Sequence, residues 1–283
     1  MILFKRAKDL REHLKSQQTQ GRKTGFAPTM GALHDGHISL VEASRKENDI
    51  TVVSIFVNPT QFNDPSDFEK YPVTIEKDIR LLEKAGCDVL FLPSVEEIYP
   101  DGQMLTNKYE LGYLESLLEG KFRPGHFQGV CQVVHRLLEI VMPANLYMGQ
   151  KDYQQCMVIK KLLEITGLER SIKLQISPTL REPGGLAMSS RNVRLSTEER
   201  SAAIAIFQAL DRIRTDLKPG DTTGLKEQAF SALTQQGFRV DYVEIADAST
   251  LKPCEEWNGQ DRLVALAAAF LGGVRLIDNL LLN

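Results

Sequence analysis

The sequence predicts an α/β protein that consists of a doubly wound parallel sheet and a smaller α+β domain. Strand-like and helix-like segments alternate over residues 1–177, which is typical of parallel βαβ units. Residues 50–57 form a nearly continuous β-branched run, as expected for a strand that is buried on both faces. After Ser177 helices are followed by strand-like runs, so we assign residues 178–283 to a second domain.

The elements of the first domain are predicted from apolar spacing and from their end signals. A short strand ends at Pro28, and the segment after it has the spacing of a helix. A later helix ends at Gly86, which suits a C-cap, and Pro143 closes a long helix. The predicted strands are residues 23–27, 50–57, 88–92, 146–148 and 172–176, and the predicted helices are residues 38–47, 74–85, 130–141 and 152–166.

The second domain is predicted to combine helices with antiparallel strands. Ser196 and Glu199 form a capping box that begins one helix, and a further helix covers residues 224–236. Gly272-Gly273 separates two apolar runs in the manner of a hairpin turn. The predicted strands are residues 239–245, 263–271 and 274–282.

Composition and charge exclude several classes of protein. Hydrophobic residues make up 42% and charged residues 25% of the chain, as in ordinary soluble globular proteins. The net charge of -3 provides no general attraction for nucleic acid or anionic lipid. The apolar run 263–274 is too short to span a membrane, and the four cysteines lack C-x-x-C spacing. We expect a cytoplasmic protein without a membrane or nucleic-acid partner.

Polar residues that directly follow strands form the candidate site, because ligands of open parallel sheets bind outside the carboxyl ends of the strands. The first such loop is Pro28–His37, with the sequence P-T-M-G-A-L-H-D-G-H. Its glycines let the backbone approach a ligand, and the following helix offers N–H groups to phosphate. His34 and His37 can stabilise polyphosphate charge. The alternatives are a helix-start pair that only satisfies backbone groups, and a zinc site, which needs further ligands.

Three later loops add polar groups of the same kind. Asn58–Asn63 carries amides that can orient a small hydroxy acid, although a solvated turn is the alternative. Gly149–Gln155 combines a helix N-cap candidate, Asp152, with Lys151, a point charge for phosphate. Met188–Asn192 offers two hydroxyls and a guanidinium, and a surface loop is the alternative. We expect these loops to meet at one end of the sheet.

Five motifs, taken in chain order, resemble those of the pantothenate synthetase family. They are P-T-M-G-A-L-H-x-G-H, F-V-N-P-T-Q-F, R-P-G-H-F-x-G-V, G-Q-K-D-x-Q-Q and M-S-S-R-N. The H-x-G-H signature is similar to that of the wider nucleotidylyltransferase superfamily, and residues 242–244 and 275–279 extend the match. The resemblance implies a Rossmann-like fold and a pantoate–β-alanine ligase (AMP-forming). Such an enzyme adenylates pantoate with ATP and passes the acyl group to β-alanine.

The resemblance also implies the role of individual residues. Mg²⁺ is the expected cofactor, and Asp78 would be associated with it, unless Asp78 is a solvated charge. The catalytic residues would be His37, His34 and Lys151. The substrate-binding residues would be Gln61, Gln155, Asn58 and Arg123, with a solvated charge again the alternative for Arg123. The ATP-binding residues would be Met30, Gly31, Ala32, Leu33, His34, Asp35, Gly36, His37, Gly149, Gln150, Lys151, Asp152, Leu180, Met188, Ser189, Ser190 and Arg191.

Two other functions compete with the ligase. A nucleotidyltransferase that transfers AMP to a phosphorylated acceptor would share the histidine signature, and a nucleotide-sensing module would bind without catalysis. The neutral amides of Asn58, Gln61 and Gln155 favour a small hydroxy acid, because a phosphorylated acceptor should recruit additional Lys or Arg. A homodimer is expected from the family resemblance.

Overall fold

The chain forms two compact units in the computed structural model, which describes residues 1–63, 65–104 and 108–283. The first unit contains Met1–Gly149 and Val158–Pro178, and the second contains Gln150–Met157 and Thr179–Asn283. Gln150–Met157 therefore belongs to the second unit, although it lies within the range 1–177 that the sequence assigned to the first domain. Hydrogen bonds from this segment to the rest of the second unit account for the difference.

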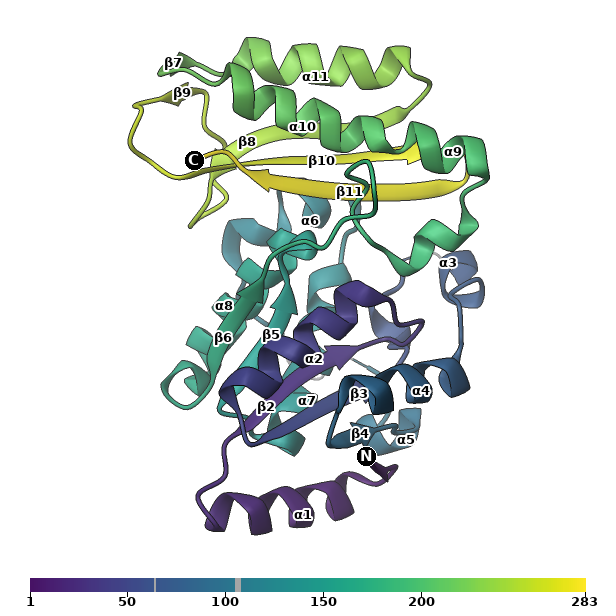
Figure 1. Ribbon diagram of the computed structural model, residues 1–283. Coiled ribbons are helices and arrows are strands. Elements are labelled where there is room, and N and C mark those ends of the chain that lie inside the picture. The colour runs from purple at the N-terminus through teal and green to yellow at the C-terminus, as the bar shows by residue number, and fades with distance from the viewer. Residues whose placement is uncertain (64, 105–107) are drawn as a thin grey trace. The chain divides into compact units, whose positions relative to one another are not determined.

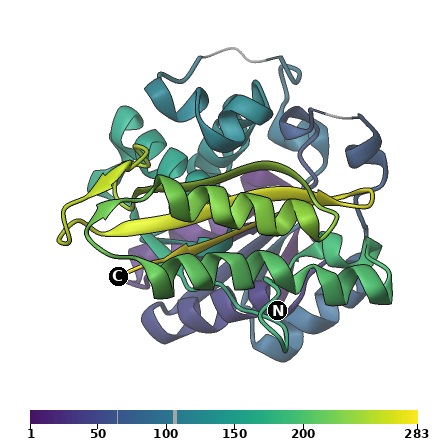
Figure 2. The same cartoon turned by 90° about the horizontal axis from the view of Figure 1, so that it is seen from above.

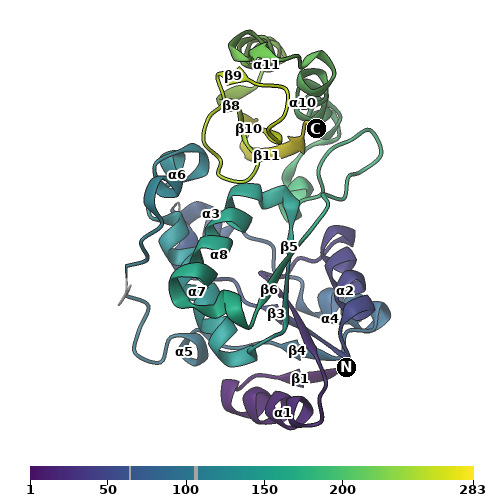
Figure 3. The same ribbon diagram turned by 90° about the vertical axis from the view of Figure 1, so that its left-hand side faces the viewer.

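The first unit is built on a six-stranded parallel sheet with the order β1-β4-β3-β2-β5-β6 (Figure 1). All six residues of β3 are buried, as the β-branched run predicted. Helices cover both faces: α2 and α4 lie on one side, and α7 and α8 lie on the other (Figure 3). The strands are β1 Ile2–Phe4, β2 Thr24–Thr29, β3 Ile50–Ile55, β4 Val89–Phe91, β5 Asn145–Gly149 and β6 Lys173–Ser177.

The helices of this unit confirm the predicted doubly wound pattern. Gly86 ends α4 with φ 74°, so the predicted glycine C-cap is correct. The α-helices are α1 Ala7–Thr19, α2 Asp35–Glu47, α3 Pro65–Glu69, α4 Ile75–Ala85, α5 Val95–Ile98, α6 Leu118–Phe122, α7 His126–Val141 and α8 Tyr153–Thr166, the last of which begins in the second unit. Short 3-10 turns are η1 Pro59–Gln61, η2 Gly112–Glu115, η3 Gln150–Asp152, which belongs to the second unit, and η4 Leu168–Arg170.

Two elements at the N-terminus were not predicted. Strand β1 has three residues, two of them exposed, so it carries little apolar pattern. Helix α1 buries Ala7, Leu10 and Leu14 among polar residues, a spacing that fits an amphipathic helix. Strand β2 also runs through Pro28 to Thr29, beyond its predicted end. Proline has no N–H to donate, and it is tolerated here because β5 pairs only with Gly25 and Phe26 of β2.

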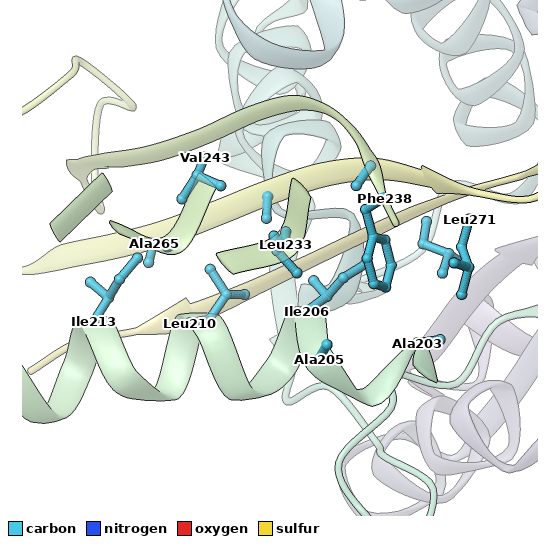
Figure 4. Packing of buried hydrophobic residues seen from close by; sticks show 14 of the residues in the cluster. Ala203, Ala205, Ile206, Leu210, Ile213, Leu233, Phe238, Val243, Ala265 and Leu271 are labelled. Carbon is cyan, nitrogen blue, oxygen red and sulfur yellow. The ribbon is translucent and has the colours of Figure 1, made fainter. Parts of the chain in front are cut away.

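The second unit contains an antiparallel sheet with the order β11-β10-β8. Helices α10 and α11 lie side by side on one face of it (Figure 2). Alternate residues of β10 face these helices, and Ile206, Leu210 and Ile213 of α10 point toward the sheet (Figure 4). The elements are α9 Thr197–Ala202, α10 Ile204–Asp216, α11 Thr223–Gln235, β7 Gly220–Asp221, β8 Arg239–Asp247, β9 Glu256–Trp257, β10 Leu263–Leu271, β11 Val274–Leu281 and the 3-10 turn η5 Ser190–Arg194.

The predicted features of this unit are largely confirmed. The capping box of Ser196 and Glu199 begins α9, and Leu271 pairs with Val274 across the predicted hairpin turn. Helix α10 was not predicted as a separate element. Within the described part of the chain, no helix combines the length and the apolar character needed to cross a bilayer.

Candidate active site

The loop between β2 and α2 presents two histidines at the start of a helix. His34 is the N-cap of α2, and its Nδ1 accepts a hydrogen bond from the Gly36 N–H at 3.2 Å. The Nδ1 of His37 accepts from the His34 N–H at 3.3 Å, and the ring centroids lie 4.1 Å apart. The two imidazoles thus form a reciprocal cap, which is the arrangement of the helix-start alternative.

This cap also defines which ring nitrogen of each histidine can donate. Because Nδ1 accepts in both rings, a neutral imidazole carries its proton on Nε2. Each Nε2–H is then the donor that an anionic oxygen can meet, so the structural role is compatible with the predicted role. Among the described residues, no group of three His, Cys, Asp or Glu side chains could hold a metal ion, which disfavours the zinc alternative.

Asp78 of α4 binds the backbone of the loop between β2 and α2. Its Oδ2 accepts from the Ala32 N–H at 2.9 Å and its Oδ1 from the Leu33 N–H at 2.8 Å. The Thr74 hydroxyl donates to Oδ1 at 3.0 Å, and Asp78 is 0% exposed. The alternative of a solvated charge is therefore wrong for Asp78. A carboxylate that is buried under three donors does not fit a direct ligand of Mg²⁺.

Asn58 is the centre of the second loop. It is 1% exposed, and its Nδ2 donates to Gln61 Oε1 and to the Gly129 carbonyl, each at 3.2 Å. Its Oδ1 accepts from the hydroxyls of Tyr99 at 2.7 Å and Thr60 at 3.1 Å. The structure therefore uses both polar atoms of Asn58 inside the protein, where they orient the amide of Gln61. Its substrate contact stays a prediction.

Gln61 joins the first two loops. Its Nε2 donates to Met30 Sδ at 3.1 Å, so the ends of β2 and β3 come together as expected. Helix α7 supports the loop from the other side at Gly129, where an added Cβ would lie 2.2 Å from the Thr60 carbonyl oxygen. Only glycine allows this close approach, which explains the second glycine of the R-P-G-H-F-x-G-V motif.

His126 links Arg123 to the same loop. Its Nδ1 lies 2.8 Å from the Gln61 carbonyl oxygen, and its Nε2 lies 3.1 Å from an Arg123 nitrogen. The tautomer protonated on Nδ1 satisfies both contacts, because Nε2 then accepts from the guanidinium. Arg123 also lies 3.8 Å from Glu119 and is 25% exposed, so the solvated alternative does not describe it. His126 was not predicted as a site residue.

The Gly149–Gln155 loop continues from the end of β5 into the second unit. Asn279 of β11 is 1% exposed, and its Nδ2 donates to the carbonyls of Gln150 at 2.9 Å and Lys151 at 2.8 Å. The Gln150 amide returns a hydrogen bond to Asn279 Oδ1 at 3.2 Å. Lys151 Nζ lies 3.5 Å from Asp152 Oδ1. Asn279 was not predicted as a site residue, because its partners lie 128 and 129 positions away.

The Met188–Arg191 stretch is also organised within the second unit. The Met188 N–H donates to the Leu180 carbonyl at 3.0 Å, and the Ser189 hydroxyl accepts from the Arg191 N–H at 3.2 Å as the N-cap of η5. Asn192 is buried and donates to Glu182 Oε1 at 2.9 Å. The alternative was a surface loop with a solvated Arg; Ser189, Ser190 and Arg191 are half-buried, and their phosphate contact stays a prediction.

The predicted site residues divide between the two units. In the first unit, hydrogen bonds join the residues at the ends of β2 and β3 to one another, while Gly149 stands at the end of β5. Those of the second unit belong to two segments held by β11 and η5. The first unit holds Met30, Gly31, Ala32, Leu33, His34, Asp35, Gly36, His37, Asn58, Gln61, Asp78, Arg123 and Gly149, and the second holds Gln150, Lys151, Asp152, Gln155, Leu180, Met188, Ser189, Ser190 and Arg191.

Comparison with known proteins gives one consistent family. The family model described as pantoate-beta-alanine ligase matches residues 2–281. A pantothenate synthetase of Bacteroides fragilis is 45% identical over 276 residues, which cover 96% of each chain. A pantothenate synthetase of Aquifex aeolicus is 45% identical over 282 residues and 98% of each chain.

Solved structures agree with these relatives. A pantothenate synthetase from Thermus thermophilus superposes with a TM-score of 0.86 at 40% identity and covers 99% of both chains. A pantoate-beta-alanine ligase from Francisella tularensis, complexed with beta-gamma ATP and beta-alanine, gives a TM-score of 0.82 at 40% identity, over 99% of this chain and 97% of that one. These likenesses confirm the predicted fold class.

Proposed function

The chain belongs to the pantoate–β-alanine ligase family, and on that premise we propose that it condenses pantoate with β-alanine at the expense of ATP. The products are pantothenate, AMP and pyrophosphate. The observation that carries the proposal is the family match over residues 2–281, which includes every loop that the sequence analysis selected.

The reaction needs two steps because a carboxylate is a poor electrophile. In the first step an oxygen of the pantoate carboxylate bonds to the α-phosphorus of ATP, and the bond to pyrophosphate breaks. In the second step the β-alanine nitrogen bonds to the acyl carbon of pantoyl adenylate and loses a proton, while the bond to AMP breaks. The relative from Francisella tularensis was solved in complex with beta-gamma ATP and beta-alanine, which supports ATP and β-alanine as substrates.

We assign the polyphosphate to cationic and N–H donors. His34 and His37 supply Nε2–H groups at the start of α2, and Lys151 supplies a positive charge. Preorganised donors of this kind stabilise charge that develops as pyrophosphate leaves. We give electrostatic stabilisation more weight than proton donation by His37, since pyrophosphate carries its charge well. Ser189, Ser190 and Arg191 are assigned to the nucleotide phosphates.

We assign the pantoate site to neutral amides. Gln61 lies between Met30 and Asn58, where its orientation is fixed by hydrogen bonds, and Gln155 is half-buried in the first turn of α8. An amide offers a donor and an acceptor together, which matches a hydroxy acid. Arg123 acts nearby through His126.

Mg²⁺, the compartment and the oligomeric state complete the proposal. When Mg²⁺ is bound to ATP, it neutralises polyphosphate charge. Asp78 does not fit as its ligand, so we route no step through that contact. The cytoplasmic location and a homodimer are proposed from the family resemblance.

Mass spectrometry of the products formed from ATP, pantoate and β-alanine tests the function. We expect pantothenate and AMP in equal amounts, and ATP–pyrophosphate exchange that requires pantoate but not β-alanine. A nucleotidyltransferase would require a phosphorylated acceptor instead, and a nucleotide sensor would show no exchange. Either result would refute the proposal.

A further inference from the structure

We propose that Asp78 is a positioning residue of the histidine loop and not a ligand of Mg²⁺. Its carboxylate shapes the backbone of residues 31–33 and so determines how His34 and His37 are presented at the start of α2. The inference rests on the proposed function for its catalytic consequence, whereas the geometry of the loop stands independently.

The backbone of the loop forms a small anion-binding concavity. Gly31 has φ 83° and Ala32 has φ 48°, so two successive residues adopt the left-handed conformation. Successive N–H groups in such a turn point to the same side, and in many proteins they bind phosphate. In this chain the N–H groups of Ala32 and Leu33 converge on the two oxygens of Asp78.

A left-handed alanine needs compensation, because its Cβ crowds the following carbonyl oxygen. Two charge-assisted hydrogen bonds, of 2.9 and 2.8 Å, stabilise this conformation. The space is also closed to larger side chains: a Cβ at Gly31 would lie 3.0 Å from Ile55 and 3.2 Å from Asp78 Oδ2. The carboxylate and the turn therefore fit each other closely.

Helix α4 fixes the carboxylate in its place. The Asp78 N–H donates to the Thr74 carbonyl at 2.9 Å, and the Thr74 hydroxyl donates to Asp78 Oδ1 at 3.0 Å. Asp78 lies in the first turn of α4, where the helix dipole favours a negative charge. Since the side chain is 0% exposed, a cation that approached it would have to displace an N–H donor.

The loop transmits this geometry to the histidines. Leu33 is 3% exposed and packs in the same apolar cluster as Leu82 of α4. With its N–H bound to Asp78 and its side chain buried, Leu33 sets the direction in which the chain enters the His34 cap. A shift of the loop would move the imidazole Nε2 atoms without removing them.

The test compares Asp78→Asn with Glu76→Gln, which removes a more exposed negative charge from the same turn of α4. In Asp78→Asn an NH₂ group replaces one carboxylate oxygen. Because this group cannot accept a hydrogen bond, one backbone N–H loses its acceptor. We expect faster hydrogen exchange at Ala32 or Leu33, by about tenfold for one lost hydrogen bond. Turnover of the folded variant should fall about 10- to 100-fold, as a displacement near 1 Å can cause. The Mg²⁺ concentration for half-maximal turnover should stay within about twofold of the unaltered protein in both variants.

A ligand of Mg²⁺ gives a different result. If the half-maximal Mg²⁺ concentration rises at least tenfold in Asp78→Asn and excess Mg²⁺ restores turnover, the proposal is wrong. It is equally wrong if amide exchange and turnover are unchanged. A purely structural role would lower the unfolding temperature and leave the turnover of the folded molecules unaltered, which also contradicts positioning.

A measurement on the unaltered protein covers the case in which the variant does not fold. Mn²⁺ alone, added without nucleotide, should leave the amide signals of Ala32 and Leu33 sharp in an NMR spectrum. Selective broadening of these two signals would place the ion at Asp78 and overturn the proposal. Because neither NMR measurement needs ligase activity, a failure here is distinct from a failure of pantothenate formation.

Discussion

Replacing Arg181 by methionine should strongly destabilise the second unit. Arg181 donates to both oxygens of Asp278, at 2.5 and 3.0 Å, and to the carbonyls of Gly185 and Asn279. Asp278 is 5% exposed, and its guanidinium partner stacks on the Phe207 ring at 4.3 Å. Methionine keeps much of the apolar stem but removes the guanidinium, which leaves the Asp278 carboxylate with the Asn279 N–H and the charge of Lys151.

The expected loss in the free energy of unfolding follows from the loss of the ion-pair partner of Asp278. Removing one partner of a buried ion pair costs about 3–5 kcal/mol. This corresponds to a rise of about 10² to 10⁴ in the unfolding constant. Trp257, the single tryptophan of the chain, lies in the second unit, so its fluorescence in a urea titration reports the unfolding of that unit.

The loss should also depend on pH in a defined direction. Burial raises the pKa of Asp278, and Arg181 opposes this shift. Without Arg181 the folded pKa should rise further above the unfolded value of about 3.9. The folded state then binds a proton that the unfolded chain releases, so stability falls as the pH rises from about 4 until it passes the folded pKa. The deficit of Arg181→Met should therefore be smaller at pH 4 than at pH 8.

A double variant and an exposed control isolate the effect. Adding Asp278→Asn to Arg181→Met removes the buried charge and should recover part of the loss. Arg212→Met, which breaks an exposed pair with Asp216, should cost less than about 1 kcal/mol. A loss below about 1 kcal/mol in Arg181→Met, or a deficit that is independent of pH, would refute the reasoning.

Three further predictions concern the loops and the thiols. Lys151→Ala should lower turnover about 100-fold, whereas Lys161→Ala, at an exposed pair, should not; equal turnover in both contradicts the assignment. Gly129→Ala should displace η1, 2.2 Å from the added Cβ, and raise the KM for pantoate; an unchanged KM contradicts this. Ellman's reagent at pH 8 should first label Cys254, because the other three thiols are buried. Burial raises the pKa of all four thiols, to about 12 for Cys87, so rapid labelling of all four contradicts this prediction.

The sheet and the loops at its edge could be predicted because their signals are local. The β-branched run at 50–57, the Gly86 cap and the Ser196 capping box each lie within a few residues of the feature they specify. Strand β1 and helix α1 lack such signals, since β1 is short and α1 buries only one narrow stripe.

The supports of the site could not be predicted in the same way. Asp78 reaches the histidine loop across 45 and 46 positions, and Asn58 reaches Gly129 across 71. The sequence does not distinguish a carboxylate, amide or imidazole that contacts a ligand from one that contacts a backbone group. Only the folded geometry shows that Asn58 donates to the Gln61 side chain and that His126 lies 2.8 Å from the Gln61 carbonyl oxygen.

The division of the chain has a consequence for dissecting the molecule by truncation. A fragment that begins at residue 178 would omit Gln150–Met157, although that segment belongs to the second unit. The buried Asn279 amide would lose both of its acceptors, and the Ala248 carbonyl would lose the Tyr153 hydroxyl, which donates to it at 2.6 Å. A graft of the C-terminal portion onto another scaffold would therefore keep these hydrogen bonds only if the segment Gln150–Met157 from the middle of the sequence accompanied it.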